Sequence, residues 1–249
     1  MTSIPALILA AGRGERMRPL TDHTPKPLLE VRGKPLMQWH MEALAAGGFT
    51  DLVVNIAWLG TQISSHFGLQ RTTDVRNALS ISYSDEQTDF GGALETAGGI
   101  VRALPLLGAG RGAGGHGMFW VVAGDVYAPD FAFAQAAVDQ FAASTALAHL
   151  WLVPNPAHNL KGDFGIGANG LALNHTDGPR YTYSTIGLYR AALFDAPLCT
   201  IPHGNPAGVK APLAPLLRQA MDLGRVSASL YEGRWTDVGT PERLAELNR

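Results

Sequence analysis

A glycine-containing, cation-rich segment near the N-terminus has the residue types that bind phosphate. An apolar run over residues 6–9 leads directly into two glycines and four cationic side chains. These are Gly12, Gly14, Arg13, Arg16, Arg18 and Lys26. Glycines let backbone N–H groups approach an anion closely, and cations this dense repel one another unless a polyanion lies among them. The segment therefore predicts a site for a polyanion such as a triphosphate.

Neither common phosphate-binding motif describes this segment. A dinucleotide fingerprint needs a glycine where the chain has Met17, and no G-K-[ST] completes a phosphate loop. An ordinary basic loop after a strand remains the alternative interpretation. For Arg13 and Arg18 in particular, solvated loop cations are an equally good interpretation.

Two aspartates are candidates for a divalent cation. Asp125, preceded by Gly124, comes directly after the apolar run 119–123, and Asp237 lies in the stretch 235–240. Mg²⁺ typically takes one or two protein carboxylates together with phosphate oxygens. Taken alone, either aspartate is typical of a turn or a helix cap.

Strand-like and helix-like segments alternate along the chain and must position these residues. We expect strands at 6–9, 52–56, 79–83, 119–123, 146–153, 181–189 and 229–235, and helices at 35–46, 60–67, 96–107, 131–142 and 213–223. This order predicts an α/β fold with a Rossmann-like, mostly parallel twisted sheet flanked by helices, whose ligand lies at the carboxyl ends of the strands. Residues 107–117 and 202–208 are expected to be mobile surface loops.

Composition excludes several classes of protein. The chain has 249 residues, 16% of them charged, and a net charge of −2, so no basic field favours nucleic acid. Its single cysteine, Cys199, excludes an internal disulfide and a cysteine-based zinc site. No apolar stretch is long enough to span a membrane. We expect a cytoplasmic protein without nucleic-acid, membrane or obligate protein partners.

The N-terminal segment resembles the signature of the sugar-1-phosphate nucleotidyltransferases, L-A-A-G-x-G-x-R-M-x-P-L-T followed by P-K-P. Residues 235–240 resemble the W-x-D-V-G-T element of the same enzymes. The resemblance implies the nucleotide-diphospho-sugar transferase fold in a single domain, 1–249. Its nucleotide-binding half would be about 1–126 and its sugar-binding half about 127–249. It also implies attack by a sugar 1-phosphate oxygen on the α-phosphorus of a nucleoside triphosphate, with release of pyrophosphate.

The same resemblance assigns roles to individual residues. Gly12, Gly14 and Glu15 shape the triphosphate loop, Arg16 meets the leaving pyrophosphate, and Lys26 reaches the reacting phosphates. Asp125 and Asp237 hold Mg²⁺. A loop with Glu95, Thr96 and Gly98 contacts the nucleobase, although a capped helix start is the alternative interpretation of that loop. Ala97 stands where the family has a glycine.

Matches along almost the whole chain resemble one subfamily, the N-acetylmuramate α-1-phosphate uridylyltransferases of bacterial cell-wall recycling. They include residues 57–60, 103–108, 162–164, 214–220 and 237–240. This resemblance implies UTP and a 2-acetamido sugar 1-phosphate as substrates. The implied sugar-binding residues are Asn155, Gly162, Asp163, Tyr183 and Ser184. Lys210 is either a contact to the acceptor phosphate or an ordinary exposed lysine.

Other functions stay open as alternatives. Thr185 replaces a common glycine of the family, which could alter the size of the pocket. The E-K-P element of the hexose-phosphate thymidylyltransferases is absent between residues 153 and 182, which weakens a glucose-1-phosphate assignment. The alternatives are transfer to another sugar phosphate, such as mannose-1-phosphate guanylyltransfer or glucose-1-phosphate thymidylyltransfer, or a non-catalytic nucleotide sensor. Intact Arg16, Lys26, Asp125 and Asp237 argue against the sensor. We expect no appended left-handed β-helix acyltransferase.

Overall fold

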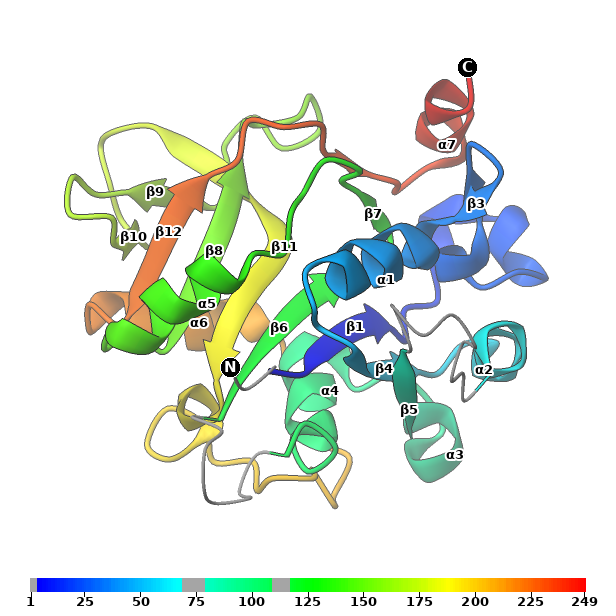
Figure 1. Cartoon of the computed structure of the whole chain (residues 1–249), viewed down its shortest axis with the longest axis horizontal. Helices are drawn as coiled ribbons and strands as arrows, with labels where there is room; N and C mark the ends of the chain where they lie inside the picture. The colour runs from blue at the N-terminus through cyan, green and yellow to red at the C-terminus, as the bar shows by residue number, and fades with distance from the viewer. Residues whose placement is uncertain (1–3, 69–78, 109–116) are drawn as a thin grey trace.

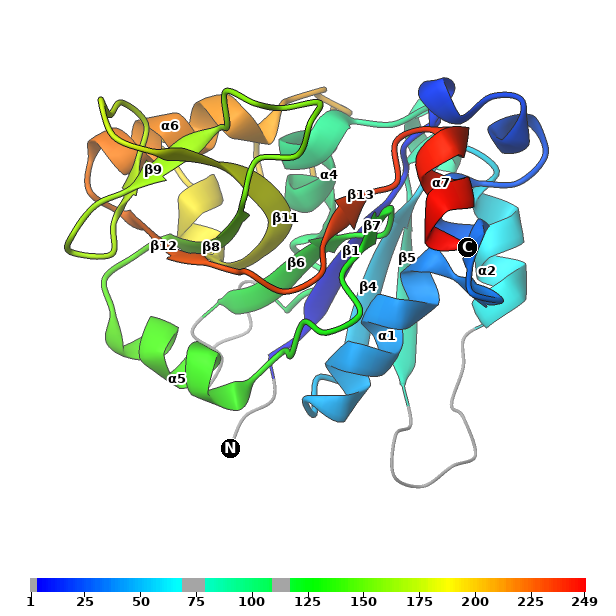
Figure 2. The same ribbon diagram turned by 90° about the horizontal axis from the view of Figure 1, so that it is seen from above.

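A twisted sheet runs through the whole molecule, and helices cover both of its faces (Figures 1 and 2). The structure is a computed structural model that describes residues 4–68, 79–108 and 117–249. Within these ranges nine strands form the main sheet. The predicted α/β class is confirmed, and the sheet is mixed.

The N-terminal part of the sheet is parallel. Its central strand, β1 (Ala6–Ala10), pairs with β6 (Met118–Ala123) on one side and β4 (Asp51–Ile56) on the other, and β5 (Ser80–Asp85) follows β4. These strands are apolar almost throughout, as expected for parallel strands buried on both faces. Their carboxyl ends meet at one edge of the sheet.

The C-terminal part joins through one long antiparallel strand, β11 (Arg180–Arg190). It pairs with β6, with β8 (Ala148–Val153) and with the short β9 (Phe164–Ile166), whose other neighbour is β10 (Ala172–Leu173). The last strand of this part, β12 (Val226–Leu230), is parallel to β8. One sheet therefore connects the two halves of the chain.

Helices on opposite faces bury alternate residues of the strands. The helices α1 (Leu36–Ala46), α2 (Gly60–Phe67) and α5 (Gln135–Ala143) share one core with Trp120 and Val122, whereas α4 (Glu95–Ala103) and α6 (Leu213–Asp222) share the other with Phe119 and Val121. This alternation along β6 follows from the two-residue period of a strand.

Short elements bring the C-terminal segment to the edge of the sheet where the parallel strands end. A two-residue ladder joins β7 (Val126–Tyr127) to β13 (Thr236–Asp237), and β2 (Glu30–Val31) pairs with β3 (Lys34–Pro35). Two further helices are α3 (Glu86–Phe90) and α7 (Pro241–Leu247), and 3₁₀ turns span Glu15–Met17, Leu20–Asp22, Lys26–Leu28 and Ala191–Phe194. Sequence patterns did not predict these short elements.

Three sequence predictions need correction or qualification. The strand expected at 229–235 is wrong for most of its length, because β12 ends at Leu230. The helix α4 ends at Ala103 instead of residue 107, because Pro105 has no N–H group to continue the hydrogen bonds of the helix. Residues 202–208 are held by the fully buried Asn205, which bonds the carbonyls of Gly98 and Val209.

The expected loop at 107–117 lies mostly outside the described residues. In the part of the chain that the structure describes, no helix is long and apolar enough to cross a membrane.

Candidate active site

The loop that follows β1 folds tightly over Lys26. Gly14 has a φ of 67°, and a Cβ at this position would lie 3.0 Å from Thr21 Cγ2 and 3.4 Å from Lys26 Cβ. A larger residue would be both strained and crowded there. Gly14 is therefore needed for the shape of the loop.

The arginines of this loop divide into two groups. Arg13 donates to Asp22 at 2.8 Å and lies over the Trp58 ring at 3.8 Å, while Arg18 pairs with Asp22 at 2.9 Å. The hydrogen bond from Arg13 lowers the pKa of Asp22. Asp22 thus pairs with both arginines, which favours the interpretation of Arg13 and Arg18 as loop cations that do not contact the substrate.

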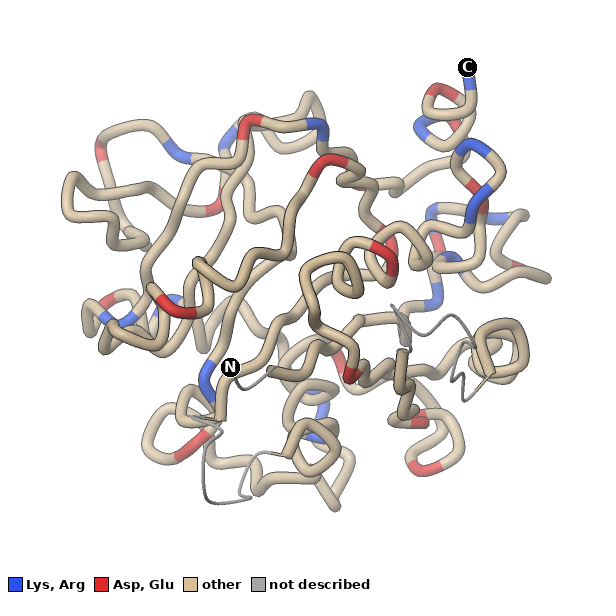
Figure 3. Tube along the Cα trace, viewed as in Figure 1, with Lys and Arg blue, Asp and Glu red and all other residues tan. Residues whose placement is uncertain are grey.

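Arg16 has a different environment. Its side chain is exposed, lines a cavity of about 250 Å³ and forms no hydrogen bond or ion pair with any residue of 4–68, 79–108 or 117–249. The cavity wall also contains Gly12, Gly14, Glu15, Lys26, Asp125 and Gly239. Figure 3 shows the basic residues of this loop on the same side of the molecule as α7. Arg16 is free to meet an anion.

Lys26 connects the two predicted metal ligands. Its buried Nζ lies 2.6 Å from Asp125 Oδ2 and 3.9 Å from Asp237 Oδ1. The ladder between β7 and β13 causes this approach, because Asp237 is in register with Val126. The predicted grouping of Lys26, Asp125 and Asp237 is therefore present in the structure.

Two residues that sequence patterns did not reveal fix the orientation of Asp237. Arg243 Nη1 lies 3.0 Å from Asp237 Oδ2, and His158 Nε2 lies 3.4 Å from the same oxygen. The opposite oxygen, Oδ1, faces Lys26. Neither Arg243 nor His158 belongs to a motif, so only the folded chain identifies them.

The carboxylates of Asp125 and Asp237 suit a hard divalent cation that also binds phosphate oxygens. Among the described residues there is no cluster of three or more His, Cys, Asp or Glu side chains that could hold a metal alone. Mg²⁺ commonly has only one or two protein carboxylates and completes its shell with water and phosphate oxygens. Asp125 and Asp237 fit that pattern.

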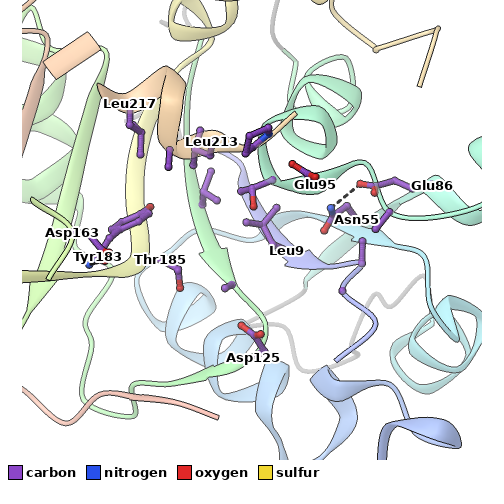
Figure 4. Close-up of a pocket in the computed structure, with 18 of the residues that line it drawn as sticks. Leu9, Asn55, Glu86, Glu95, Asp125, Asp163, Tyr183, Thr185, Leu213 and Leu217 are labelled. Atoms are coloured by element: carbon purple, nitrogen blue, oxygen red, sulfur yellow. Dashed lines mark hydrogen bonds between the residues drawn. The ribbon is translucent and has the colours of Figure 1, made fainter. Parts of the chain in front are cut away.

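A larger cavity, of about 650 Å³, extends from Gly12 and Asp125 along the sheet edge (Figure 4). Glu95 and Thr96 line the side where the sequence predicts the nucleobase. Gly98 does not line it, because its Cβ position would lie 2.5 Å from the carbonyl oxygen of Val209. Gly98 allows α4 to pack closely against the backbone at Val209, and it supports the base loop without lining the cavity.

Buried polar groups connect the base loop to the triphosphate loop. Ala10 N donates to Asn55 Oδ1 at 2.7 Å, Asn55 Nδ2 donates to Glu86 Oε1 at 2.8 Å, and Leu94 N donates to Glu86 Oε2 at 2.8 Å. Burial raises the pKa of Glu86. Sequence reasoning missed this chain of contacts; the signal that could have found it is Asn55, a polar residue within an apolar strand.

Asp163, Tyr183 and Thr185 line the side of the cavity predicted for the sugar. Asp163 Oδ2 accepts from Tyr183 N at 2.8 Å, and Oδ1 accepts from Asn159 at 3.2 Å. The Tyr183 hydroxyl lies 2.7 Å from that of Tyr189, and burial raises the pKa of both phenols. Asp163 is therefore held rigidly in the cavity wall.

Several predicted site residues lie behind the cavity. Ser184 is fully buried, and its hydroxyl donates to the Trp151 carbonyl at 2.6 Å. Tyr183 and Thr185 both line the cavity, as the two-residue period of a strand requires, and the same period turns the intervening Ser184 to the opposite face. The role that the resemblance implied for Ser184 therefore has no support in the cavity lining.

Other predicted contacts support loops. Asn155 accepts from Thr182 Oγ1 at 3.0 Å and donates to the carbonyl of Arg180 at 2.9 Å, while Gly162, at a φ of 62°, packs directly on residues 180–181. Gly124 is buried against the end of β1, with its N–H bonded to Leu9 O at 2.8 Å. Lys210 is exposed and lines neither cavity.

Comparison with known proteins agrees with this geometry. The nucleotidyl transferase family matches residues 5–169. An N-acetylmuramate α-1-phosphate uridylyltransferase from Neisseria meningitidis serogroup B is 46% identical over 97% of this chain and 95% of its own length. The Caulobacter vibrioides enzyme of the same name is 31% identical over 97% of each chain.

A solved structure supports the fold. A Bacillus anthracis protein, described as a glucose-1-phosphate thymidylyltransferase and bound to sucrose, superposes with a TM-score of 0.75 at 20% identity, covering 99% of this chain and 94% of that one. The chain therefore belongs to the sugar-1-phosphate nucleotidyltransferase family, whose members transfer a nucleotide to a sugar 1-phosphate.

Proposed function

We propose that this protein transfers UMP from UTP to N-acetylmuramate α-1-phosphate, forming UDP-N-acetylmuramate and pyrophosphate. The observation that carries the proposal is the 46% identity, over nearly the whole chain, to an enzyme named for this reaction. Further physical support comes from the larger cavity and from the grouping of Lys26, Asp125 and Asp237 beside it.

The reaction needs positioning and charge neutralisation more than a protein nucleophile. An oxygen of the sugar phosphate bonds to the α-phosphorus of UTP, the bond from that phosphorus to the bridging oxygen breaks, and pyrophosphate leaves. Phosphoryl-type transfer is accelerated mainly by alignment and by groups that stabilise developing negative charge. Arg16 and Lys26 supply cationic groups beside the smaller cavity.

Lys26 and the two aspartates form one ion-paired unit, in which Lys26 is buried between Asp125 and Asp237. Arg243 also pairs with Asp237, so these four side chains carry no net charge. A cation would therefore bind there together with the negatively charged triphosphate. We propose that Asp125 and Asp237 hold Mg²⁺, which when bound neutralises phosphate oxygens and orients the triphosphate.

We assign roles to the other residues of the larger cavity from their positions in its wall. Glu95 and Thr96 contact the uracil, and Asp163 and Thr185 contact the sugar. The rigid Asp163 carboxylate suits a sugar hydroxyl, since each of its oxygens retains a free acceptor direction beside its protein hydrogen bond.

A substrate matrix tests the proposal. UTP, GTP, CTP and dTTP are each combined with the 1-phosphates of N-acetylmuramate, N-acetylglucosamine, glucose and mannose, and pyrophosphate release is measured. We expect kcat/KM for UTP with N-acetylmuramate 1-phosphate to exceed every other pair by about tenfold or more. Preference for another base or sugar would refute the specific assignment.

Metal removal tests the cation in the same assay. EDTA should abolish pyrophosphate release, and excess Mg²⁺ should restore it. Full activity in EDTA would contradict the role given to Asp125 and Asp237.

A further inference from the structure

Within residues 4–68, 79–108 and 117–249, one cationic side chain lines the larger cavity, and the proposed transfer reaction does not use it. The titratable groups in that wall are Arg218 and Tyr183 together with four carboxylic acids, Glu86, Glu95, Asp125 and Asp163. A ligand with its own carboxylate would be repelled by most of this wall. Arg218 offers the attractive contact.

The side chain of Arg218 is available, and its backbone is fixed. Leu213, Leu216, Leu217 and Ala220 of α6 are buried in the core beneath the cavity, whereas Arg218 is exposed. Its guanidinium lies 6.0 Å from the centre of the Phe164 ring and forms no hydrogen bond or ion pair within residues 4–68, 79–108 and 117–249. A planar guanidinium with free donors binds a carboxylate through two parallel hydrogen bonds.

Asp163 does not satisfy Arg218, although both residues line the cavity. The two oxygens of Asp163 accept from Tyr183 N and from Asn159 Nδ2. Their partners are thus a backbone N–H of β11 and a side chain of the loop before β9, and the guanidinium is left for a ligand.

The part of α6 that carries Arg218 lies away from the predicted metal ligand Asp125. Figure 4 shows Leu217, the neighbour of Arg218 on α6, at the opposite end of the cavity from Asp125. Lys26 and Arg16 lie on the Asp125 side, where they line the smaller cavity. The phosphate of the acceptor must approach Asp125, so a second anionic group of the acceptor would extend toward α6.

We propose that Arg218 is a specificity-determining residue that binds the lactyl carboxylate of N-acetylmuramate 1-phosphate. This inference rests on the proposed function. N-acetylglucosamine 1-phosphate has the same sugar, acetamido group and phosphate but lacks the lactyl ether and its carboxylate. Arg218 therefore distinguishes the two acceptors by charge.

Steady-state kinetics with both acceptors at saturating UTP test the assignment. The variants are Arg218→Gln, which keeps hydrogen-bonding capacity without charge, and Arg218→Lys, which keeps the charge without the planar fork. Lys161→Gln is the matched control, because Lys161 is exposed in the same half of the chain and lines neither cavity. Circular dichroism and the KM for UTP report folding and the nucleotide site.

For Arg218→Gln we expect KM for N-acetylmuramate 1-phosphate to rise about tenfold to a hundredfold, the effect of losing a charge-assisted contact. Kinetics with N-acetylglucosamine 1-phosphate should change less than about twofold, Arg218→Lys should be intermediate, and Lys161→Gln should resemble the wild type.

Equal losses with both acceptors would overturn the assignment and place Arg218 on the phosphate or in the fold. An unchanged KM for N-acetylmuramate 1-phosphate would also overturn it. Both results leave the proposed function intact, because the wild-type comparison of acceptors decides that separately. A wild type that does not use N-acetylmuramate 1-phosphate would refute the proposed function and this inference together.

Discussion

Three arginines within six residues have different roles, and one aspartate causes the difference. Asp22 lies 2.8 Å from Arg13 and 2.9 Å from Arg18, so both guanidiniums are occupied within the loop. Arg16 faces the smaller cavity without a protein partner among the described residues. Whether an arginine of this loop can bind a ligand therefore depends on its ion pairing and not on its position in the sequence.

This difference gives a matched pair of variants. Arg16→Gln should lower kcat by about a hundredfold or more, the effect of removing one group that stabilises charge in the transition state. Arg18→Gln removes the same charge two positions later and should change kcat only a few fold, because exposed ion pairs contribute little. Steady-state kinetics on both variants measure the contrast.

Thermal unfolding of the two proteins provides the control for folding. Equal losses of kcat in both variants would indicate that the loop acts only through its overall charge, and the role given to Arg16 would be wrong.

At the scale of elements, buried polar contacts fix the distance between two loops. Asn55 is the second-last residue of β4, and Glu86 is the first residue of α3. Between them they bind the N–H groups of Ala10 and Leu94, which lead into the triphosphate loop and the base loop. Both side chains are buried, and a Cβ on Gly99 would lie 2.6 Å from Glu86 Oε1. A residue larger than glycine at position 99 would therefore displace Glu86 or Asn55.

Glu86→Gln tests this connection with a change of almost no volume. Glu86 accepts from two donors, whereas a glutamine amide has only one oxygen, so an N–H₂ group would face either Asn55 Nδ2 or Leu94 N. We expect a loss of about 1 to 3 kcal/mol in the free energy of unfolding, measured in urea, together with a higher KM for UTP.

The exposed Glu42→Gln is the control for removing a negative charge. Unchanged stability and an unchanged KM in Glu86→Gln would show that the two loops are positioned by other contacts.

Elements with a long apolar pattern could be predicted from the sequence, and short ones could not. The expected strand 52–56 and helix 60–67 correspond to β4 and α2, since periodicity over several residues identifies them. The two-residue strands β7 and β13 have no periodicity, although they bring Asp237 to Asp125. For the site, motif residues such as Lys26 could be found, whereas Glu86, His158 and Arg218 depend on tertiary contacts.

At the scale of the whole molecule, stability should depend on pH through buried histidines. His40 and His149 both have a pKa lowered to about 4, mainly because burial disfavours the imidazolium. Below the ordinary histidine pKa of 6.5 the unfolded chain binds protons that the native protein does not bind. The free energy of unfolding therefore decreases as pH falls from about 6.5 to about 4. Glu86, with its raised pKa, contributes in the opposite direction.

His149→Gln isolates one of these protons at a site remote from the predicted metal ligands. His149 lies on β8, where its Nδ1 is 2.9 Å from Ser227 Oγ and its ring packs on Trp151. Between pH 4 and 6.5, the slope of the unfolding free energy against pH should be smaller in the variant by up to about 1.4 kcal/mol per pH unit. Above pH 7.5 the curves should run parallel, because the imidazole is then neutral in both states. Urea unfolding at half-unit pH steps measures both regions, and an unchanged slope would show that His149 is already protonated in the native protein.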